Sequence, residues 1–502
     1  MGLKRNILAN YFGAGWTALM TLAFIPLYIR YLGVEAYGLI GLFAMLQGWL
    51  LLLDLGMAPA ISREMAAFDG TPDHARALRN LLRSMEMLAL ALAATIAIVL
   101  WVSSRWLAET WLSPKDVPVG VVIQSLSLMG GVIGLRIIEN IYRSALIGMQ
   151  RQVLLNAINS SIATLRGLGA VGVLACVSPT LQAFFLWQGF VSLCAVALLS
   201  QATYRALPRT DTRAEFSVQA LRTVWRFAAG AMAIACLSLL LTNVDKVLLS
   251  HLLSLKDFGY YAFAIVVANT PVAVVPPIVQ AIYPRLTQLS AGSEAELAAV
   301  YHAAAQLVVV LLGAATVVLV LLGHELLAMW TRDAALAQRI YPLVIVLSLG
   351  SLLNGLLILP YYLQLSAGWT GLTIRVNVAA LVLVVPALLL VIPAYGGMGA
   401  AWIWLSLNVF LMVTVIPRLH RRLLPAEKKH WYLNDVAIPL LSAAAMAVLL
   451  HVLLSLVPGG ARNILVLLAC AALVLMSAAL AAPLIRLRVF ALLERHSMPG
   501  TD

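Results

Sequence analysis

Long apolar segments alternate with short polar ones along almost the whole chain. A helix needs about 20 predominantly apolar residues to cross the hydrocarbon core of a bilayer, and segments of that length recur throughout this sequence. We predict about fourteen spans, at approximately 7–29, 36–58, 83–103, 119–146, 153–176, 181–201, 225–250, 258–282, 303–323, 340–364, 372–392, 398–416, 433–456 and 463–484. The pattern therefore predicts an all-α, polytopic membrane protein.

Composition and charge agree with this pattern. The 502 residues are 62% hydrophobic and 11% charged, whereas soluble domains are roughly 45–50% apolar and 25% charged. An even number of spans places both termini on one side, and with that side cytoplasmic the inner segments hold about three times as many Lys and Arg residues as the outer loops. This bias predicts cytoplasmic termini. It also accounts for most of the net charge of +12, so no nucleic-acid partner is needed to explain it.

A weak internal repeat divides the sequence into two halves. Tyr37 and Gly38 align with Phe258 and Gly259, and at the same offset Asn156 aligns with Asn377. The repeat predicts six-helix lobes at 1–210 and 215–420, with helices 13 and 14 at 431–485 and a cytoplasmic tail at 486–502. Six spans per half give parallel lobes related by a pseudo-two-fold axis along the membrane normal, an arrangement in which transporters bind substrate between the halves. The alternative is chance similarity between apolar segments.

Short motifs stand at the start of each half. They are Asn6-Ile-Leu-Ala-Asn-Tyr, Pro26-Leu-Tyr-Ile-Arg-Tyr-Leu-Gly, Tyr37-Gly and Asp54-Leu-Gly in the first half, and Asp245-Lys246 followed by Phe258-Gly-Tyr-Tyr-Ala in the second. With these motifs the chain resembles the Wzx-type polysaccharide (O-antigen or exopolysaccharide) flippases of the multidrug/oligosaccharidyl-lipid/polysaccharide exporter superfamily. One departure is Ser254, which stands where the repeat would place the counterpart of Gly33.

The resemblance implies both a fold and a function. The fold is a MATE-like bundle of two lobes in a bacterial inner membrane. The function is alternating-access transfer of an undecaprenyl-diphosphate-linked oligosaccharide from the cytoplasmic to the periplasmic leaflet. Glycosyltransferases and a glycan polymerase are the protein partners that such a role implies.

Five polar residues interrupt the fourth and fifth spans: Arg136, Glu139, Asn140, Arg143 and Arg166. Ionisable groups are costly in hydrocarbon, so they normally face a bundle interior or a watery cavity and mark a functional site. The spacing of the first four places them along one helical face. Arg136 and Arg166 lie equally far from the turn near Arg151, so tightly joined antiparallel spans would bring them to one depth.

We interpret Arg136 and Arg166 as a clamp that binds the cargo diphosphate through bidentate hydrogen bonds. Glu139 and Asn140, one turn inward, would orient Arg136 or release it in exchange for a proton. The alternative is a structural Arg136–Glu139 pair. For Arg143 we favour contact with the cytoplasmic headgroups.

Three further charged sites are candidates for coupling or gating. Asp245 could bind a coupling proton or sodium ion, or it could close a periplasmic gate with Arg30, and a structural cap explains it as well as a gate does. Neighbouring helical residues point about 100° apart, so Asp245 and Lys246 are not expected to face each other. Asp54 lies near the cytoplasmic end of the second span, where interfacial solvation explains it as well as function does.

The eighth span contains Pro271, Pro276 and Pro277. Proline removes a backbone hydrogen bond and kinks a helix, and interrupted spans often mark transporter sites. We therefore regard these prolines as hinge candidates.

Other functional classes lack their sequence signals. The eight histidines and four cysteines show no ligand spacing, and no phosphate-binding glycine loop occurs, so we expect no metal and no cofactor. Without ATP hydrolysis, an ion gradient is the expected energy source. The outer loops are too short for a membrane glycan ligase or polymerase, so we expect no enzyme.

A MATE-type drug or cation exporter would require cavity carboxylates rather than arginines. A lipid II flippase, which shares the span number and a basic cavity, is a second alternative, and the motifs quoted above favour the polysaccharide flippases over it.

Overall fold

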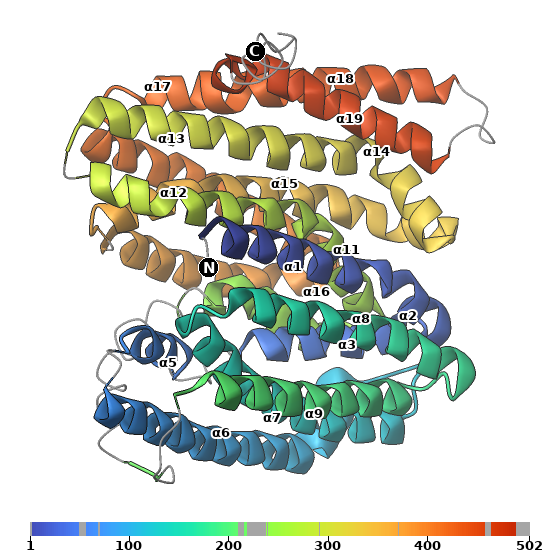
Figure 1. Cartoon of the computed structure of the whole chain (residues 1–502). Coiled ribbons are helices and arrows are strands. Elements are labelled where there is room, and N and C mark those ends of the chain that lie inside the picture. The colour runs from blue at the N-terminus through green and yellow to red at the C-terminus, as the bar shows by residue number, and fades with distance from the viewer. Residues whose placement is uncertain are drawn as a thin grey trace, which may run out of the picture. The chain divides into compact units, whose positions relative to one another are not determined.

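Helices built from the apolar segments make up the structure (Figure 1). The computed structural model describes residues 3–49, 57–68, 71–208, 215–217, 237, 239–290, 292–369, 371–456 and 463–487, and no strand occurs in these ranges. The chain forms two compact units, Met1–Gly259 and Tyr260–Asp502.

Eleven helices in the described ranges are long and apolar enough to cross a bilayer. One of them, α16 (Gly371–Leu423), consists of two helices joined at Gly396, where φ is 58° and ψ is −143°, and so it covers two of the predicted spans. The apolar helix α3 (Val34–Gly48) is shorter. The end of the second predicted span and much of the seventh lie outside the described residues. The predicted all-α fold is confirmed, and the chain is a multi-pass membrane protein.

In its described residues, the first unit is built mainly from eight helices and one π-helical turn. They are α1 (Leu3–Ala23), α2 (Ile25–Leu32), α3, α5 (Met57–Ala66), α6 (Pro72–Trp106), the π-helix η1 (Leu107–Leu112), α7 (Val119–Gly148), α8 (Gln152–Cys176) and α9 (Leu181–Ala206). Residues 239–252 are also helical. Capping residues fix where two of these helices begin: the Thr71 hydroxyl accepts from the His74 amide, and the Thr180 hydroxyl accepts from the Ala183 amide.

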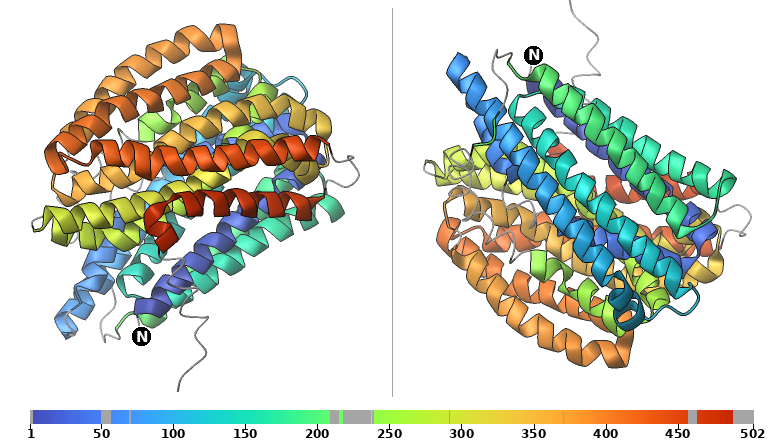
Figure 2. Two further views of the ribbon diagram at one scale, coloured as in Figure 1. Left: turned by 90° about the horizontal axis from the view of Figure 1, so that it is seen from above. Right: turned by 90° about the horizontal axis from the view of Figure 1, so that it is seen from below.

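Helix α7 is at the centre of the first unit. It packs against α6 and α9, while α8 packs chiefly against α1 and α9. The α1–α8 pair can be followed in Figures 1 and 2. Ile141 of α7 and Leu82 and Met85 of α6 belong to one buried apolar cluster. Because α7 is enclosed in this way, its polar residues must find partners inside the protein.

The second unit continues from α11 (Leu255–Asn269), whose first residues belong to the first unit. It contains the 3₁₀ helix η2 (Thr270–Val274), α12 (Val275–Leu289), α13 (Glu294–Val308), the π-helix η3 (Val309–Gly313), α14 (Ala314–Thr331), α15 (Ala334–Ser366), α16, α17 (Lys428–His430), the π-helix η4 (Trp431–Ala437), α18 (Ile438–Ser455) and α19 (Ile464–Ala481). Helices α18 and α19 run side by side and pack on α14 (Figure 2).

The two glycines that the repeat aligns meet where α3 crosses the start of α11. A Cβ on Gly38 would lie 2.5 Å from the Leu255 carbonyl oxygen, and a Cβ on Gly259 would collide with the Val34 carbonyl oxygen. Both obstacles are backbone atoms, which cannot rotate away. Small residues allow helices in membranes to approach this closely. The crossing therefore requires glycine at both positions.

We predict that Gly38→Ala and Gly259→Ala each destabilise the protein by about 1–3 kcal/mol through overpacking. The measurement is the unfolding midpoint in detergent. Gly131→Ala on α7 is the matched control, since a Cβ there meets nothing within 4 Å. Equal midpoints for all three variants and the wild type would show that the crossing tolerates a side chain.

Candidate functional site

A buried carboxylate on α7 binds two arginines. Glu139 is only 2% exposed. Its Oε1 lies 2.6 Å from Nη2 of Arg166 on α8, and its Oε2 lies 3.1 Å from Nη2 of Arg143, one turn further along α7. Arg166 also donates to the Ser192 hydroxyl on α9 at 3.0 Å. The Glu139–Arg166 pair, together with Ser192, thus links three helices.

Arg136 belongs to the same group but has neutral partners. It donates to Gln47 Oε1 of α3, and its guanidinium lies over the Phe43 ring, 5.3 Å from the centroid. No carboxylate lies within ion-pair distance of Arg136 in the described part of the chain. The Nε atoms of Arg136 and Arg166 are both buried, and neither has a hydrogen-bond partner there.

We call Arg136, Glu139, Arg143 and Arg166 the arginine cluster. Three guanidiniums stay charged at any physiological pH, and one carboxylate balances only one of them. The cluster therefore carries an excess of about two positive charges. In a low-dielectric setting an unbalanced charge is costly, and each unpaired N–H adds to that cost. An anion with several acceptor oxygens would satisfy both deficits.

The structure differs from the sequence interpretation in the pairing of the charges. Glu139 pairs with Arg166 and Arg143, not with Arg136. Arg143 bonds to Glu139, and its expected contact with the headgroups stays a prediction. After their shared turn, helices α7 and α8 pack mainly against other helices, and both contact α9, whose Ser192 binds Arg166.

Asn140 is half-buried on α7, beside Glu139. Gln47 and Ser192 are partners that sequence reasoning missed. Both are neutral residues inside apolar helices, and the only signal for them was their polarity.

The coupling and gate candidates lie elsewhere in the first unit. Lys246 Nζ lies 3.3 Å from Asp245 Oδ1, so these neighbouring side chains do approach each other, and it also donates to the Thr242 carbonyl. Asp245 is buried. Arg30 is exposed on the last turn of α2. Asp54 lies outside the described residues. The gate and coupling roles stay predictions.

The prolines lie where the eighth predicted span is interrupted. Pro271 is in the first turn of η2, and Pro276 and Pro277 are in the first turn of α12, so none of them removes a hydrogen bond from a continuous α-helix. Asn269, just before η2, accepts a 2.7 Å hydrogen bond from the Ser351 hydroxyl of α15. The structure places the prolines at a break, and their hinge role stays a prediction.

Two other buried carboxylates in the first unit have their hydrogen bonds satisfied. Glu35 accepts from the backbone amides of Lys115 and Asp116, each at 2.6 Å. Glu86 accepts from the hydroxyls of Tyr142 and Tyr204. These groups hold loops and helices together.

The loop that Glu35 binds carries one more ion pair. Asp116 lies 3.0 Å from Lys256, and this hydrogen bond and charge lower the pKa of the Asp116 carboxyl. Because that pKa is lowered on folding, the contribution of the pair is present at neutral pH and is lost on acidification.

We predict a strong coupling between Glu139 and Arg166. Breaking a buried pair leaves an uncompensated charge, so a double-mutant cycle of Glu139→Gln and Arg166→Met should give about 2–3 kcal/mol, measured from unfolding in detergent. The exposed pair Arg105–Glu109, at 3.0 Å, is the matched control and should give less than about 1 kcal/mol. Similar coupling in both pairs would argue against a buried, charge-unbalanced cluster.

Solved structures of similar fold are membrane transporters. The structure described as "Lipid II flippase MurJ, inward closed conformation" matches with a TM-score of 0.68 and 11% identity, covering 94% of this chain and 97% of that one. An inward-facing multidrug resistance MATE family transporter of the MOP superfamily matches with 0.63 and 13%, covering 81% and 95%. The MATE multidrug transporter DinF-BH matches with 0.60 and 16%, covering 84% and 95%. At these identities the likeness establishes the MATE-like fold alone.

Sequence comparison identifies the family. No curated protein matches the chain. The family described as "Polysaccharide biosynthesis protein" matches residues 3–290, which is more than half of the sequence. This match confirms the resemblance seen in the motifs at the starts of the two halves. The chain belongs to the polysaccharide biosynthesis protein family.

Proposed function

We propose that the protein is a flippase for undecaprenyl-diphosphate-linked glycan repeat units, which it moves from the cytoplasmic to the periplasmic leaflet of a bacterial inner membrane by alternating access. The observation that carries this proposal is the arginine cluster around the buried Glu139, with its excess of positive charge and two Nε atoms without a partner in the described residues. The family match adds that the proposed cargo belongs to polysaccharide biosynthesis.

The cluster suits a diphosphate in particular. Guanidinium and phosphate groups form paired, charge-assisted hydrogen bonds, which are stronger than neutral ones. Arg136 would bind the diphosphate first, because its present partners, Gln47 and Phe43, are both neutral and no carboxylate of the described residues competes for it. Arg166 would follow by exchanging Glu139 for a phosphate oxygen. Return of Glu139 to Arg166 would then help to release the cargo on the other side.

A MATE-type drug or cation exporter would share this fold, but the charges of the described site suit it less well. Binding a cation within the bundle requires a carboxylate that is free to accept it. The described buried carboxylates of the first unit are Glu35, Glu86, Glu139 and Asp245, and each already has a hydrogen-bonding or ion-pair partner. A lipid II flippase is the nearer alternative, since a basic cluster serves any lipid-linked diphosphate. The motifs at the starts of the two halves favour the polysaccharide branch.

The proposed transport needs an energy source and proteins that supply and use the glycan. The chain carries no nucleotide-binding motif, so we assign the driving force to a proton or sodium gradient. Glu139 and Asp245 would bind the coupling ion only after leaving their present ion-pair partners, Arg166 and Lys246. Both termini would be cytoplasmic. Glycosyltransferases that build the repeat unit would precede the flippase, and a periplasmic polymerase would follow it.

We predict that Arg136→Ala and Arg166→Ala, each at wild-type protein level, abolish surface glycan and leave lipid-linked oligosaccharide in the cytoplasmic leaflet. Losing one charged hydrogen-bonding group removes about 1.5–3 kcal/mol of binding, or roughly 10- to 100-fold in affinity. Lysine at either position should restore export only in part, because it lacks the planar fork of arginine.

Arg105→Ala is the matched control, since it removes an exposed arginine that also pairs with a glutamate. Export should be unchanged in this variant. Normal export in both the Arg136 and Arg166 variants would disprove the proposed role of the cluster. A liposome assay that compares transfer of lipid II with transfer of the glycan lipid distinguishes the two cargoes. The same assay with an imposed proton or sodium gradient identifies the coupling ion.

A further inference from the structure

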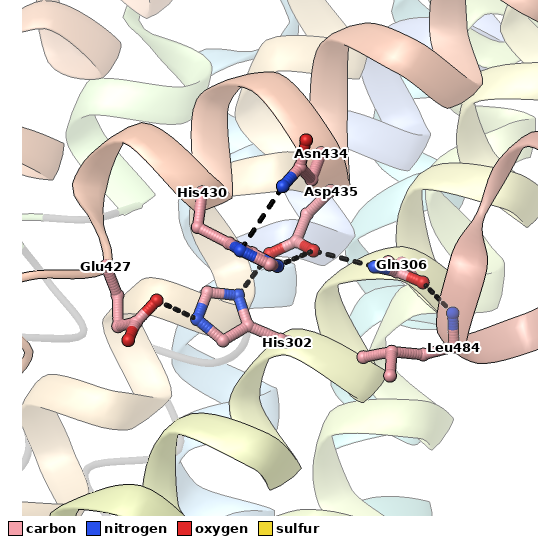
Figure 3. Close-up of polar contacts among 7 residues, drawn as sticks. All are labelled: His302, Gln306, Glu427, His430, Asn434, Asp435 and Leu484. Carbon is pink, nitrogen blue, oxygen red and sulfur yellow. Dashed lines mark hydrogen bonds and ion pairs between the residues drawn. The ribbon is translucent and has the colours of Figure 1, made fainter.

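A second buried ionic group lies in the other unit, far from the arginine cluster in sequence. His302 and Gln306 come from α13, Glu427 precedes α17, His430 ends α17, and Asp435 lies in the π-helical turn η4 (Figure 3). Asp435 is completely buried, and His302 is almost so. Neither the proposed transport cycle nor the sequence patterns assign a role to this group.

The hydrogen bonds of His302 require a second proton or a metal ion in this group. Its Nε2 lies 3.1 Å from Glu427 Oε2, and its Nδ1 is in close contact with Asp435 Oδ2. A neutral imidazole has only one N–H. If that proton is donated to Glu427, the Nδ1 lone pair faces a carboxylate oxygen, which is repulsive. In the other tautomer Nδ1 donates to Asp435 and the Nε2 lone pair faces Glu427 instead. Both contacts are therefore satisfied together only when the group holds a second proton or when a metal ion binds one of the two ring nitrogens.

The side chains around this point form a metal-ligand set. His302, His430 and Asp435 each offer one ligand atom, and these three atoms all lie within 4.8 Å of one another. His430 Nε2 is 3.8 Å from Asp435 Oδ1. Bonds of about 2.0–2.2 Å to a tetrahedral zinc ion place neighbouring ligand atoms about 3.3 Å apart. Small movements of the two histidines would bring the three atoms to that spacing.

The surrounding residues orient these ligands as the outer partners of metal sites do. Glu427 accepts from the distal nitrogen of His302, Gln306 Nε2 donates to Asp435 Oδ1 at 2.9 Å, and the Asn434 amide lies 3.3 Å from His430 Nδ1. Gln306 is itself fixed by the Leu484 backbone amide, which donates to its Oε1 at 2.9 Å. Figure 3 shows this chain of contacts.

Access and coordination number also favour a metal. The His430 side chain is 43% exposed, so an ion can enter without unfolding the buried carboxylate. Three protein ligands leave a fourth tetrahedral position for water. Two imidazoles and one carboxylate are a donor set that suits zinc and related first-row ions better than magnesium or calcium, which prefer oxygen ligands.

We propose that His302, His430 and Asp435 bind one zinc-class divalent ion. The ion would join α13 to the η4 turn, which begins the predicted thirteenth span. Through Gln306 and Leu484 the same site contacts the segment after α19. The metal would therefore anchor the C-terminal helix pair α18–α19 to the rest of the second unit.

The test uses the full-length protein in detergent, stripped with a chelator and titrated with zinc chloride at pH 7.5. We expect one zinc per chain by elemental analysis and a rise in the unfolding midpoint on zinc addition. His430→Ala should still fold, because His430 is half-exposed, and should bind zinc at least about 100-fold more weakly. Gln306→Ala, which alters only an outer partner, should weaken binding by about 10- to 100-fold.

His451→Ala is the control, since His451 is an exposed histidine of α18 in the same unit. It should bind zinc as the wild type does. Cobalt substitution adds a second readout, because cobalt bound by histidine and carboxylate in a tetrahedral site absorbs visible light, and His430→Ala should abolish that band. Wild-type protein that takes up no stoichiometric zinc, or a His430→Ala variant that binds as tightly as the wild type, would overturn the proposal in favour of a protonated His302.

Discussion

A charge that leaves water for the interior of a membrane protein must be balanced by a partner brought from another part of the chain. Glu139 shows how much structure this requirement controls. Its two oxygens are held by Arg166 of α8 and Arg143 of its own helix, and Arg166 is in turn held by Ser192 of α9. The carboxylate is the one negative charge in the arginine cluster, so the positions of three helices depend on it.

The same balance determines what the site can bind. The cluster contains one carboxylate and three arginines. The ion pairs of Glu139 stabilise it, but its net charge stays positive. Arg136 contacts the neutral side chains of Gln47 and Phe43 and, among the described residues, is the arginine of the cluster without an ion-pair partner. An added anion completes the cluster, whereas an added cation would compete with Arg166 for Glu139. The proposed anionic cargo rests on this count of charges, and the proposed diphosphate rests on the geometry of guanidinium groups.

The lengths of the apolar segments predicted the fold, because a bilayer fixes how long a spanning helix must be. Sequence reasoning also found the four charged members of the arginine cluster, since charge is rare in such helices. It could not find their partners. Gln47 and Ser192 resemble many other polar residues in apolar segments, and the separation of α7 from α8 depends on packing with α1, α6 and α9. His302 and Asp435 are 133 residues apart, so no local spacing indicated that they meet. The break at η2 was visible in the prolines, but the 3₁₀ turn that accommodates it was not.

The most direct measurement is a structure of the protein in a lipid nanodisc with an undecaprenyl-diphosphate-linked oligosaccharide bound. The proposed function predicts that the diphosphate lies within hydrogen-bond distance of the Arg136 guanidinium, and that Arg166 has exchanged Glu139 for a phosphate oxygen. A bound diphosphate that contacts neither arginine, with the Glu139–Arg166 pair intact, would contradict it.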